Sequence, residues 1–382
     1  MLRRRPRPRV VLGVDSLEPK NSGIGRVARL MTRALAEAAA TDRLEAEVVV
    51  YTDGSSTEEA RALGLPIRST VCRSKLRYVA SIHAAARRAD ALVFDSPSMT
   101  RGAPWLPGLR RPIVTFIHGI EVWEGATRAH LQACRRSDHL ISNTAYTPRR
   151  AAGLHPWVGF DRAVSCWLAT EADEPLPNNL VARPAEGPFR AIVIGRVDPS
   201  FAKGHRELVH AWPQVVQCDP HAELVIVGTG TGDAQLDRWI AESPVRERIR
   251  RTGFVPDAEL PGLLASSTVF AMPSRSEGFG LVYIEAMRAG LPCMGGSVDA
   301  SAEVVLDGKT GRIVTTDDVN AVAQALVELA TDRAQAAALG EAGRDRWFEW
   351  FRYAAFRDRF LHVLGEQLAV DLSVDRDASM TG

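Results

Sequence analysis

Short apolar runs alternate with amphipathic segments along most of the chain, from Val10 to Leu368. The apolar runs predict buried strands at 10–15, 46–51, 91–94, 113–117, 139–141, 191–194, 223–227, 248–252, 269–272 and near 293. Apolar residues at helical spacing predict helices at 24–40, 57–63, 75–88, 126–136, 145–152, 204–217, 233–241, 257–264, from 281, and at 300–306, 317–331, 333–346 and 347–368. Strands that alternate with helices form parallel sheets covered on both faces. The pattern therefore predicts an α/β protein built from doubly wound, Rossmann-like sheets.

The alternation is interrupted between Glu171 and Pro188, where prolines and asparagines gather as they do in linkers. A chain of 382 residues is also too long for one ordinary core, since domains usually hold roughly 150 to 200 residues. We therefore predict an N-terminal domain at 1–172, a linker at 173–188 and a C-terminal domain at 189–350. In doubly wound domains, ligands bind at the carboxyl ends of the strands.

Composition excludes several classes of protein. No apolar run reaches the roughly 20 residues of a membrane-spanning helix, and the basic start at 1–9 leads into a strand rather than a signal peptide. The five cysteines are scattered and form no C-x-x-C pair, which argues against both a disulfide framework and a zinc site. A reducing cytoplasm fits this cysteine usage best.

The charge is unevenly distributed, although the whole chain carries a net charge of only +1. Residues 1–175 have an excess of eight positive charges, and the remainder has an excess of seven negative charges. Residues 68–88 contain six Lys or Arg, no Asp or Glu, and several apolar residues between them. Two interpretations stay open for this segment, a basic amphipathic surface for anionic lipid and a solvated helix face.

The stretch 273–292 carries the most specific chemistry. A strand at 269–272 ends in a proline, two glycines mark a turn, and a helix begins near 281. Glu277 then lies on a strand-to-helix loop and Glu285 lies on the helix behind it. Such a loop offers N–H groups and the positive end of a helix dipole, while carboxylates accept hydrogen bonds from hydroxyls. The stretch predicts a ligand that is anionic at one end and hydroxyl-rich elsewhere.

Other strand ends of the second domain also carry candidate ligand-binding groups. Arg196 follows the first strand and Lys203 precedes the next helix, where two cations suit a pyrophosphate. The alternative is a solvated loop with two surface cations. Gly230, in a Gly-Thr-Gly-Thr-Gly turn, and Val255, in a Thr-Gly-Phe-Val-Pro turn, either contact a nucleotide or only turn the chain.

The first domain has two weaker candidates. His118 follows a strand and precedes a glycine, which places it well for a ligand, although a lone histidine is more often structural. Gly25 ends a Gly-Ile-Gly turn that, with Asp53 downstream, formally matches a dinucleotide fingerprint. That fingerprint begins immediately after its strand, whereas seven residues separate Asp15 from this turn. An NAD-dependent oxidoreductase is therefore only a distant alternative.

The motif Glu277-Gly-Phe-Gly-Leu-x3-Glu285-Ala-Met-x-Ala-Gly-Leu-Pro292, with Gly195-Arg196 upstream, resembles the retaining glycosyltransferases of family 4, which have the GT-B fold. The resemblance runs from about Val10 to Leu364. It implies two Rossmann-like domains facing a cleft, a helix at 351–370 that crosses back onto the first domain, and a polar tail at 371–382. Asp299 and Ala300 stand where the family often has a pair of glycines.

The resemblance also implies roles for individual residues. It implies that Arg196 and Lys203 meet the pyrophosphate of a nucleotide-diphosphate sugar, such as GDP-mannose or a UDP-sugar, and that Glu285 meets the ribose. It implies that Glu277 contacts the transferred sugar and that His118 lies at the reacting side of that sugar. The remaining donor-binding residues implied are Gly25, Gly230, Val255, Gly278, Phe279, Gly280 and Leu281.

The implied activity is transfer of a hexosyl unit, with retention, to a hydroxyl of a glycolipid, a lipid-linked saccharide or a polysaccharide precursor. We expect no cofactor, no metal ion and no nucleic-acid partner; the D-x-D pair at Asp375 and Asp377 lies in the polar tail and is discounted. A cytoplasmic location, with peripheral binding to the inner membrane face, is expected. A sugar-nucleotide epimerase or a phosphorylase of the same fold, and a non-catalytic sugar-binding relative, stay open as alternatives.

Overall fold

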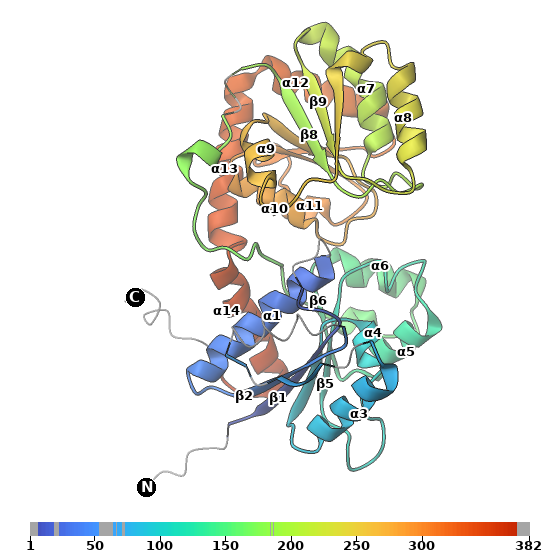
Figure 1. Cartoon of the computed structure of the whole chain (residues 1–382), viewed down its shortest axis with the longest axis vertical. Coiled ribbons are helices and arrows are strands. Elements are labelled where there is room, and N and C mark those ends of the chain that lie inside the picture. The colour runs from blue at the N-terminus through green and yellow to red at the C-terminus, as the bar shows by residue number, and fades with distance from the viewer. Residues whose placement is uncertain are drawn as a thin grey trace. The chain divides into compact units, whose positions relative to one another are not determined.

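The computed structural model describes residues 7–18, 23–52, 64–65, 67–70, 73–183, 185 and 187–372. Four features of the sequence predictions lie outside these residues: Asp53, the helix at 57–63, the first six residues and the tail with Asp375 and Asp377. The chain divides into two compact units, Met1–Glu171 with Tyr353–Gly382, and Ala172–Arg352. Each unit is built around its own parallel sheet (Figure 1).

The first unit has a seven-stranded sheet in the order β3-β2-β1-β4-β5-β6-β7, and all of its strand pairs are parallel. Its strands are β1 (Arg9–Val14), β2 (Glu45–Val50), β3 (Ile67–Thr70), β4 (Ala91–Phe94), β5 (Ile113–Ile117), β6 (His139–Ser142) and β7 (Val164–Ser165). Its helices are α1 (Gly23–Ala40), α3 (Lys75–Ala86), α4 (Pro97–Thr100), α5 (Arg128–Arg136), α6 (Tyr146–Leu154), α14 (Tyr353–Leu368) and the short 3-10 helix Phe160–Arg162. Strand order reverses between β1 and β4, which is where doubly wound sheets bind ligands.

The second unit repeats this plan with a six-stranded parallel sheet in the order β10-β9-β8-β11-β12-β13. Its strands are β8 (Arg190–Ile194), β9 (Glu223–Val227), β10 (Ile249–Gly253), β11 (Val269–Met272), β12 (Cys293–Gly296) and β13 (Gly311–Val314). Its helices are α7 (His205–Cys218), α8 (Asp233–Glu242), α9 (Leu260–Ala265), α10 (Leu281–Arg288), α11 (Ser301–Val304), α12 (Val319–Thr331) and α13 (Arg333–Trp350), with 3-10 turns at Asn178–Leu180 and Arg246–Arg248. The α/β class and the two Rossmann-like sheets are therefore confirmed.

Local sequence explains where several helices begin. Ser74, Thr127 and Asp318 each adopt an extended backbone before α3, α5 and α12, and their side chains accept hydrogen bonds from N–H groups of the first turn. The strands of the two sheet centres are apolar and buried on both faces, as parallel strands between helices must be. Capping and burial together fix where the loops at the strand ends begin.

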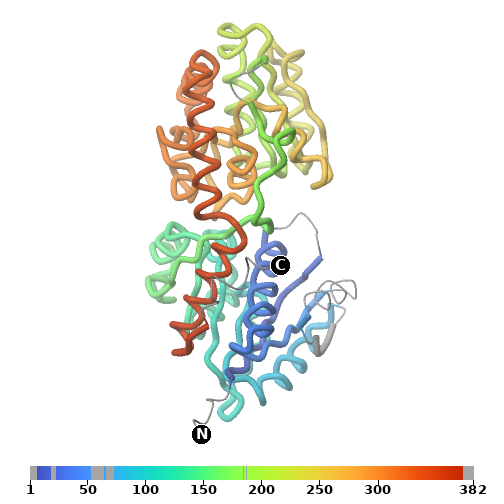
Figure 2. The backbone as a smooth tube through the Cα atoms, turned by 90° about the vertical axis from the view of Figure 1, so that its left-hand side faces the viewer, coloured from blue at the N-terminus to red at the C-terminus, as the bar shows by residue number. Residues whose placement is uncertain are grey.

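The C-terminal helix α14 belongs to the first unit, where it packs against α1. Figure 2 shows the chain returning among the N-terminal elements before it ends. Arg357, on α14, is nearly buried and pairs with Glu37 of α1 at 3.1 Å and with its neighbour Asp358 at 2.9 Å. The prediction of one helix from 347 to 368 was wrong at its start, because α13 runs on to Trp350 and the chain turns at Phe351 and Arg352.

Three strands were absent from the sequence predictions. β3 and β13 contain an arginine and β7 has only two residues, so none of them forms a continuous apolar run. All three are the outermost strands of their sheets. Outer strands need less apolar surface than central strands, which explains why a pattern of buried residues did not find them.

Candidate functional site

The loops that follow β8 and β9 lie against each other at the carboxyl edge of the second sheet. Val197 donates its N–H to the carbonyl of Thr229 at 3.2 Å and accepts a hydrogen bond from Gly232 N–H at 3.0 Å. A Cβ atom on Gly230 would lie only 1.9 Å from the Val197 carbonyl oxygen, so only glycine fits there. The structure thus gives Gly230 a packing role, and it leaves open the donor contact that was predicted for it.

Lys203 and Glu277 form an ion pair at this edge, between the loop before α7 and the loop after β11. Both side chains keep some exposure to solvent. A Cβ on Gly195 would lie 2.3 Å from the Lys203 side chain, so this glycine lets the lysine cross the end of β8. The structure therefore brings together a cation and a carboxylate, predicted respectively to bind pyrophosphate and sugar, at the N-terminus of α7.

Asp299 holds the Glu277 loop in place. One oxygen of its buried carboxylate accepts a hydrogen bond from Glu277 N–H at 2.8 Å, and the other accepts one from Ser301 N–H at 2.9 Å. Burial raises the pKa of Asp299, and the hydrogen bonds from Ser274 and Ser301 oppose that shift. Sequence reasoning noted Asp299 only as a departure from the family pattern, and the one available signal was an acid at the end of a strand.

The residues between Glu277 and α10 also lie where a strand-to-helix loop was predicted. Gly280 has a φ of 84° and directly precedes α10, which begins at Leu281 as expected. The Phe279 ring is buried and meets the Phe351 ring edge-on at 5.9 Å, so only its backbone can face a ligand. Gly278 is partly buried on this loop, and Glu285 is partly buried on α10.

Two other predicted donor-binding residues lie just after β8 and β10. The Arg196 side chain, just after β8, is exposed and has no ion pair within the described residues. Val255 follows β10 by two positions and is half-buried. Arg196, Val255, Lys203 and Glu277 thus all belong to the carboxyl edge of the second sheet.

His118 lies at the carboxyl end of β5 in the first unit, where its ring stacks on Phe116 with centroids 5.1 Å apart. Its Nε2 atom lies 2.6 Å from the carbonyl oxygen of Asp95. A carbonyl can only accept a hydrogen bond, so Nε2 donates its proton to it, and Nδ1 is the ring atom left to contact a ligand. Glu121 and Asn143 fix the backbone around it, through His118 N–H and His118 C=O respectively.

Asp95 directly follows β4, lies beside His118 and is fully buried. Burial raises the pKa of its carboxyl group to about 7, although hydrogen bonds from Asp15 N–H and Ser96 Oγ oppose the shift. The negative charges of Asp15 and Glu121 add to the rise. Asp95 was missed by sequence reasoning, because a single acid after a strand is a weak signal.

Gly25 is buried within the first turn of α1, and residues 15–22 separate this helix from β1. The helix expected from residue 24 begins at Gly23, so the Gly-Ile-Gly segment that was expected to turn the chain forms the first turn of α1. The long connection also departs from the dinucleotide fingerprint, whose glycines directly follow the strand.

The described residues contain no group of three or more His, Cys, Asp or Glu side chains arranged to hold a metal ion. Within the same part of the chain, no helix is both long enough and apolar enough to cross a membrane.

The sequence of the chain is similar to those of known glycosyltransferases. Residues 188–332, which include the Lys203–Glu277 pair, match the family described as Glycosyl transferases group 1. A GDP-mannose-dependent alpha-(1-6)-phosphatidylinositol monomannoside mannosyltransferase of Mycolicibacterium smegmatis is 39% identical over 159 residues, or 39% of this chain and 41% of that protein. Over a longer stretch, a phosphatidyl-myo-inositol mannosyltransferase of Mycobacterium leprae is 30% identical across 280 residues, covering 70% of this chain and 72% of that protein.

The chain belongs to the group 1 glycosyl transferase family. The resemblance predicted from the stretch 277–292 is confirmed by this match. The most similar part of the chain spans only about two fifths of the M. smegmatis mannosyltransferase. An Anabaena protein, HepE, solved in complex with UDP, has the same fold, with a TM-score of 0.74, 18% identity, and coverage of 94% of this chain and 100% of that chain.

The glycosyl transferase has a GT-B fold, as predicted, and its second unit contains the whole matched segment. The N-terminus of α7 directs partial positive charge toward the edge where Lys203 and Arg196 lie. The neighbouring Glu277 offers an acceptor for hydroxyl groups. This edge is therefore suited to a ligand that combines a phosphate group with a sugar.

Proposed function

We propose that the chain transfers a hexosyl unit from a nucleotide-diphosphate sugar to a hydroxyl acceptor. The observation that carries the proposal is the Lys203–Glu277 ion pair at the N-terminus of α7, inside the segment that matches the family. The relatives named as GDP-mannose-dependent mannosyltransferases of phosphatidylinositol mannosides support GDP-mannose as the donor and an inositol glycolipid as the acceptor.

In the proposed mechanism, Arg196, Lys203 and the N-terminus of α7 stabilise the negative charge that develops on the departing diphosphate. Glu277, with the backbone of 278–281, orients the sugar, and Glu285 binds the ribose of the nucleotide. The acceptor hydroxyl attacks from the face that the diphosphate leaves, so the anomeric configuration is retained. Side-chain cations supply the charge in this mechanism, and we propose that neither a metal ion nor another cofactor takes part.

We further propose that the acceptor binds at the carboxyl edge of the first sheet. The Nδ1 atom of His118 can accept a hydrogen bond there, because Nε2 is occupied by the Asp95 carbonyl. The attacking hydroxyl needs an acceptor for its proton, and His118 provides one. His118 and Glu277 are thus the two proposed catalytic residues, one in each unit.

A direct test is to incubate the purified chain with GDP-mannose and with UDP-sugars, with and without phosphatidylinositol-based acceptors, and to identify products by mass. We expect transfer to the acceptor. Proton NMR should show an α-linkage in the product of an α-linked donor. A changed sugar nucleotide without an acceptor product would instead indicate an epimerase. Binding of a nicotinamide dinucleotide, with no binding of any sugar nucleotide, would overturn the proposal.

Two substitutions test the site. We expect Lys203→Met and Glu277→Gln each to lower kcat by roughly 10²- to 10³-fold, because the first removes a group that stabilises the charge of the departing diphosphate and the second loosens the orientation of the sugar. Lys309→Met and Glu341→Gln, which make the same changes at exposed positions, should leave the rate unchanged. Rates near wild type for both site variants, in protein whose circular dichroism is unaltered, would show that the site lies elsewhere.

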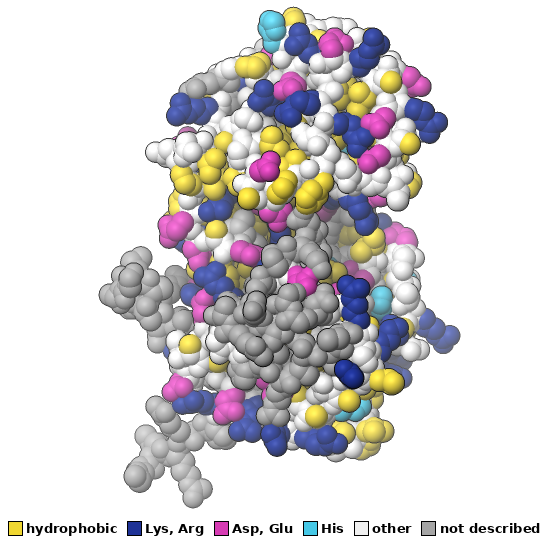
Figure 3. Space-filling view, in the orientation of Figure 1, with side chains coloured by type: hydrophobic (Ala, Val, Ile, Leu, Met, Phe, Trp, Pro, Cys, Tyr) yellow, Lys and Arg dark blue, Asp and Glu magenta, His cyan; other side chains and the backbone are white. Residues whose placement is uncertain are grey.

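We also propose that the first unit binds an anionic membrane surface through α3. At the start of this helix, Leu76 is 85% exposed between the exposed side chains of Lys75 and Arg77. Figure 3 shows basic and hydrophobic side chains side by side over the region where Figure 1 places α3. An exposed apolar residue flanked by cations is the combination that peripheral proteins use on anionic lipid.

A further inference from the structure

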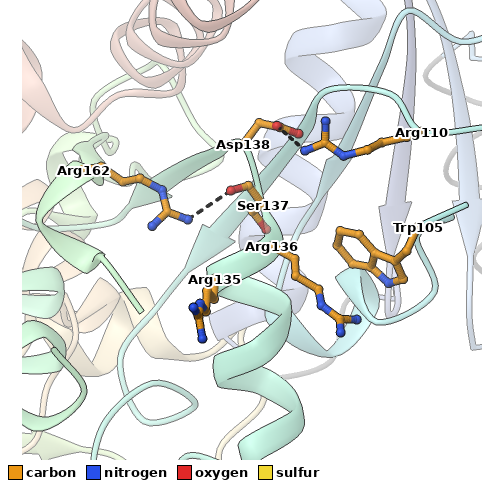
Figure 4. Close-up of a pocket in the computed structure, with 7 residues that line it drawn as sticks. All are labelled: Trp105, Arg110, Arg135, Arg136, Ser137, Asp138 and Arg162. Atoms are coloured by element: carbon orange, nitrogen blue, oxygen red, sulfur yellow. Dashed lines mark hydrogen bonds and ion pairs between the residues drawn. The ribbon is translucent and has the colours of Figure 1, made fainter. Parts of the chain in front are cut away.

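The first unit contains a hollow of about 720 Å³ that is distant in the fold from the strand ends discussed above. It is lined by Trp105, Arg110, Arg135, Arg136, Ser137, Asp138 and Arg162, and we call it the arginine pocket (Figure 4). Arg110 lies three residues before β5, Asp138 directly precedes β6, and Arg135 and Arg136 end α5. The pocket therefore lies at the amino edge of the parallel sheet, whereas His118 lies at the carboxyl edge.

The pocket has more cations than its own acceptors neutralise. Its one carboxylate, Asp138, already accepts a hydrogen bond from Arg110 at 2.6 Å and another from Ile113 N–H at 2.9 Å. The Ser137 hydroxyl is likewise engaged, with Thr115 Oγ1 at 2.7 Å and the Ala133 carbonyl at 2.9 Å. Four arginines and one aspartate leave an excess of three positive charges around this hollow.

Arg162 satisfies the end of α5. It donates to the carbonyls of Cys134 at 2.7 Å and Ser137 at 3.0 Å, and to those of Val158 and Gly159 near its own helix. A cation at a helix C-terminus stabilises the exposed carbonyls and the dipole. Since Arg162 already stabilises the C-terminus of α5, this role does not explain the presence of Arg135 and Arg136.

Arg135 and Arg136 are exposed, and each lies over an indole ring. The guanidinium carbon of Arg135 is 5.7 Å from the centre of Trp157, and that of Arg136 is 5.5 Å from the centre of Trp105. Neither forms an ion pair or hydrogen bond within the described part of the chain. Stacking on an aromatic face orients a guanidinium and leaves its N–H edge available for a bidentate contact with phosphate.

We propose that the arginine pocket binds a phosphate-bearing anion, at a site separate from the donor site. Arg135 and Arg136 supply the charge-assisted hydrogen bonds, and Arg110 and Arg162, held by their own partners, supply additional positive potential. The volume is in the range of pockets that hold small molecules, roughly 300 to 1,000 Å³. The phosphate group can belong to a free phosphorylated compound or to a lipid headgroup. The proposal does not rest on the proposed transferase activity.

The test is a titration of the whole ¹⁵N-labelled chain with inorganic pyrophosphate. Binding is monitored by NMR through the indole N–H signals of Trp105 and Trp157. These signals report on the pocket and not on the edge of the second unit, where pyrophosphate is also expected to bind. We expect the chemical shifts of these signals to change saturably with pyrophosphate. The affinity obtained from them should be at least tenfold weaker in Arg135→Gln/Arg136→Gln. The shift changes should persist in Lys203→Met and in Arg238→Gln/Arg246→Gln, which removes two exposed cations from the second unit.

A second arm distinguishes the sources of the phosphate group, using vesicles of phosphatidylcholine with and without phosphatidylinositol phosphate. Shifts with pyrophosphate alone would assign the pocket to free phosphorylated compounds. Additional binding to the phosphoinositide vesicles, lost in the same double variant, would assign it to headgroups. Unchanged shifts in the double variant, or no saturable shift at millimolar pyrophosphate, would overturn the proposal. Both arginines are exposed, so the double variant is expected to keep its fold.

Discussion

Asp95 combines complete burial with a carboxyl pKa raised to about 7, chiefly through loss of solvent. The same carboxyl group has a pKa of about 3.9 in an unfolded chain. Between these two values the folded state holds a proton that the unfolded state has released. The free energy of unfolding should therefore fall as pH rises from about 4 to 7, by up to about 1.4 kcal/mol for each pH unit.

Urea unfolding of wild type and of Asp95→Asn, at several pH values between 4 and 8, measures this contribution. We expect the variant to lose less stability than wild type across the interval, because it has no group that must release a proton at this position. Asp161→Asn changes an exposed aspartate and should follow the wild-type curve. Parallel curves for wild type and Asp95→Asn would contradict the assignment.

Residues of the candidate site were predictable where neighbouring residues in a short segment indicate their role. Lys203 and Glu277 were found because each stands at a strand end beside glycines and a helix start, and the structure brings the two together. Asp299 and Asp95 were not found, because their importance comes from contacts with segments more than 20 residues away. A single sequence does not show which distant N–H group a carboxylate will meet.

At the scale of elements, the contact between the loops after β8 and β9 shapes the candidate donor site. Gly230 has no room for a side chain, since its Cβ would lie 1.9 Å from the Val197 carbonyl oxygen. Gly230→Ala must push the loop after β8 away. Overpacking of this kind typically costs about 1 to 3 kcal/mol. We expect lower thermal stability and at least tenfold weaker binding of the nucleotide sugar, measured by calorimetry.

Gly262→Ala is the matched control for this substitution. Gly262 lies in α9, and no atom outside its immediate surroundings lies within 4 Å of the Cβ that alanine would add. Alanine favours a helix over glycine by about 1 kcal/mol, so this variant should be neutral or slightly more stable. Equal behaviour of the two variants would show that the contact with Val197 is not important.

Elements with strong periodicity were predicted well, whereas their exact ends and their contacts were not. The apolar run at 269–272 coincides with β11, and the helix expected from 281 begins at Leu281. The outer strands β3 and β13 were missed, because they lack the apolar runs of central strands. The segment Gly23-Ile-Gly25 was expected as a turn at the helix start, because glycine disfavours a helix, yet α1 already begins at Gly23.

At the scale of the whole molecule, the two sheets share one strand order and their matching edges carry the candidate chemistry. Alternating strands and helices joined by right-handed connections indicate a doubly wound parallel sheet, so the fold class was predictable from the sequence, whereas the strand order was not. The packing of α14 on α1 was expected only through the resemblance, because nothing in the sequence of α14 specifies its partner. Its burial of Phe356 and Phe360 in the first unit explains why the chain returns there.

The uneven charge of the molecule leads to a prediction about membranes. The first half of the chain carries the excess of positive charge, and α3 adds the exposed Leu76 to it. Each basic residue near an anionic surface contributes about 1 kcal/mol, and the burial of one leucine contributes roughly 1.5 to 3 kcal/mol. We expect Lys75→Glu/Arg77→Glu and Leu76→Ser each to reduce cosedimentation with phosphatidylglycerol vesicles at least tenfold.

Arg238→Glu/Arg246→Glu makes the same change in net charge on the second unit and should leave vesicle binding nearly intact. Salt separates the two contributions, because it screens the cations but not the leucine. Raising the salt concentration should weaken wild-type binding strongly, and it should have little effect on the binding that Lys75→Glu/Arg77→Glu retains. If the two charge variants lose binding equally and Leu76→Ser keeps it, only the net charge of the molecule matters. If none loses it, α3 is an ordinary solvated helix and the membrane proposal is wrong.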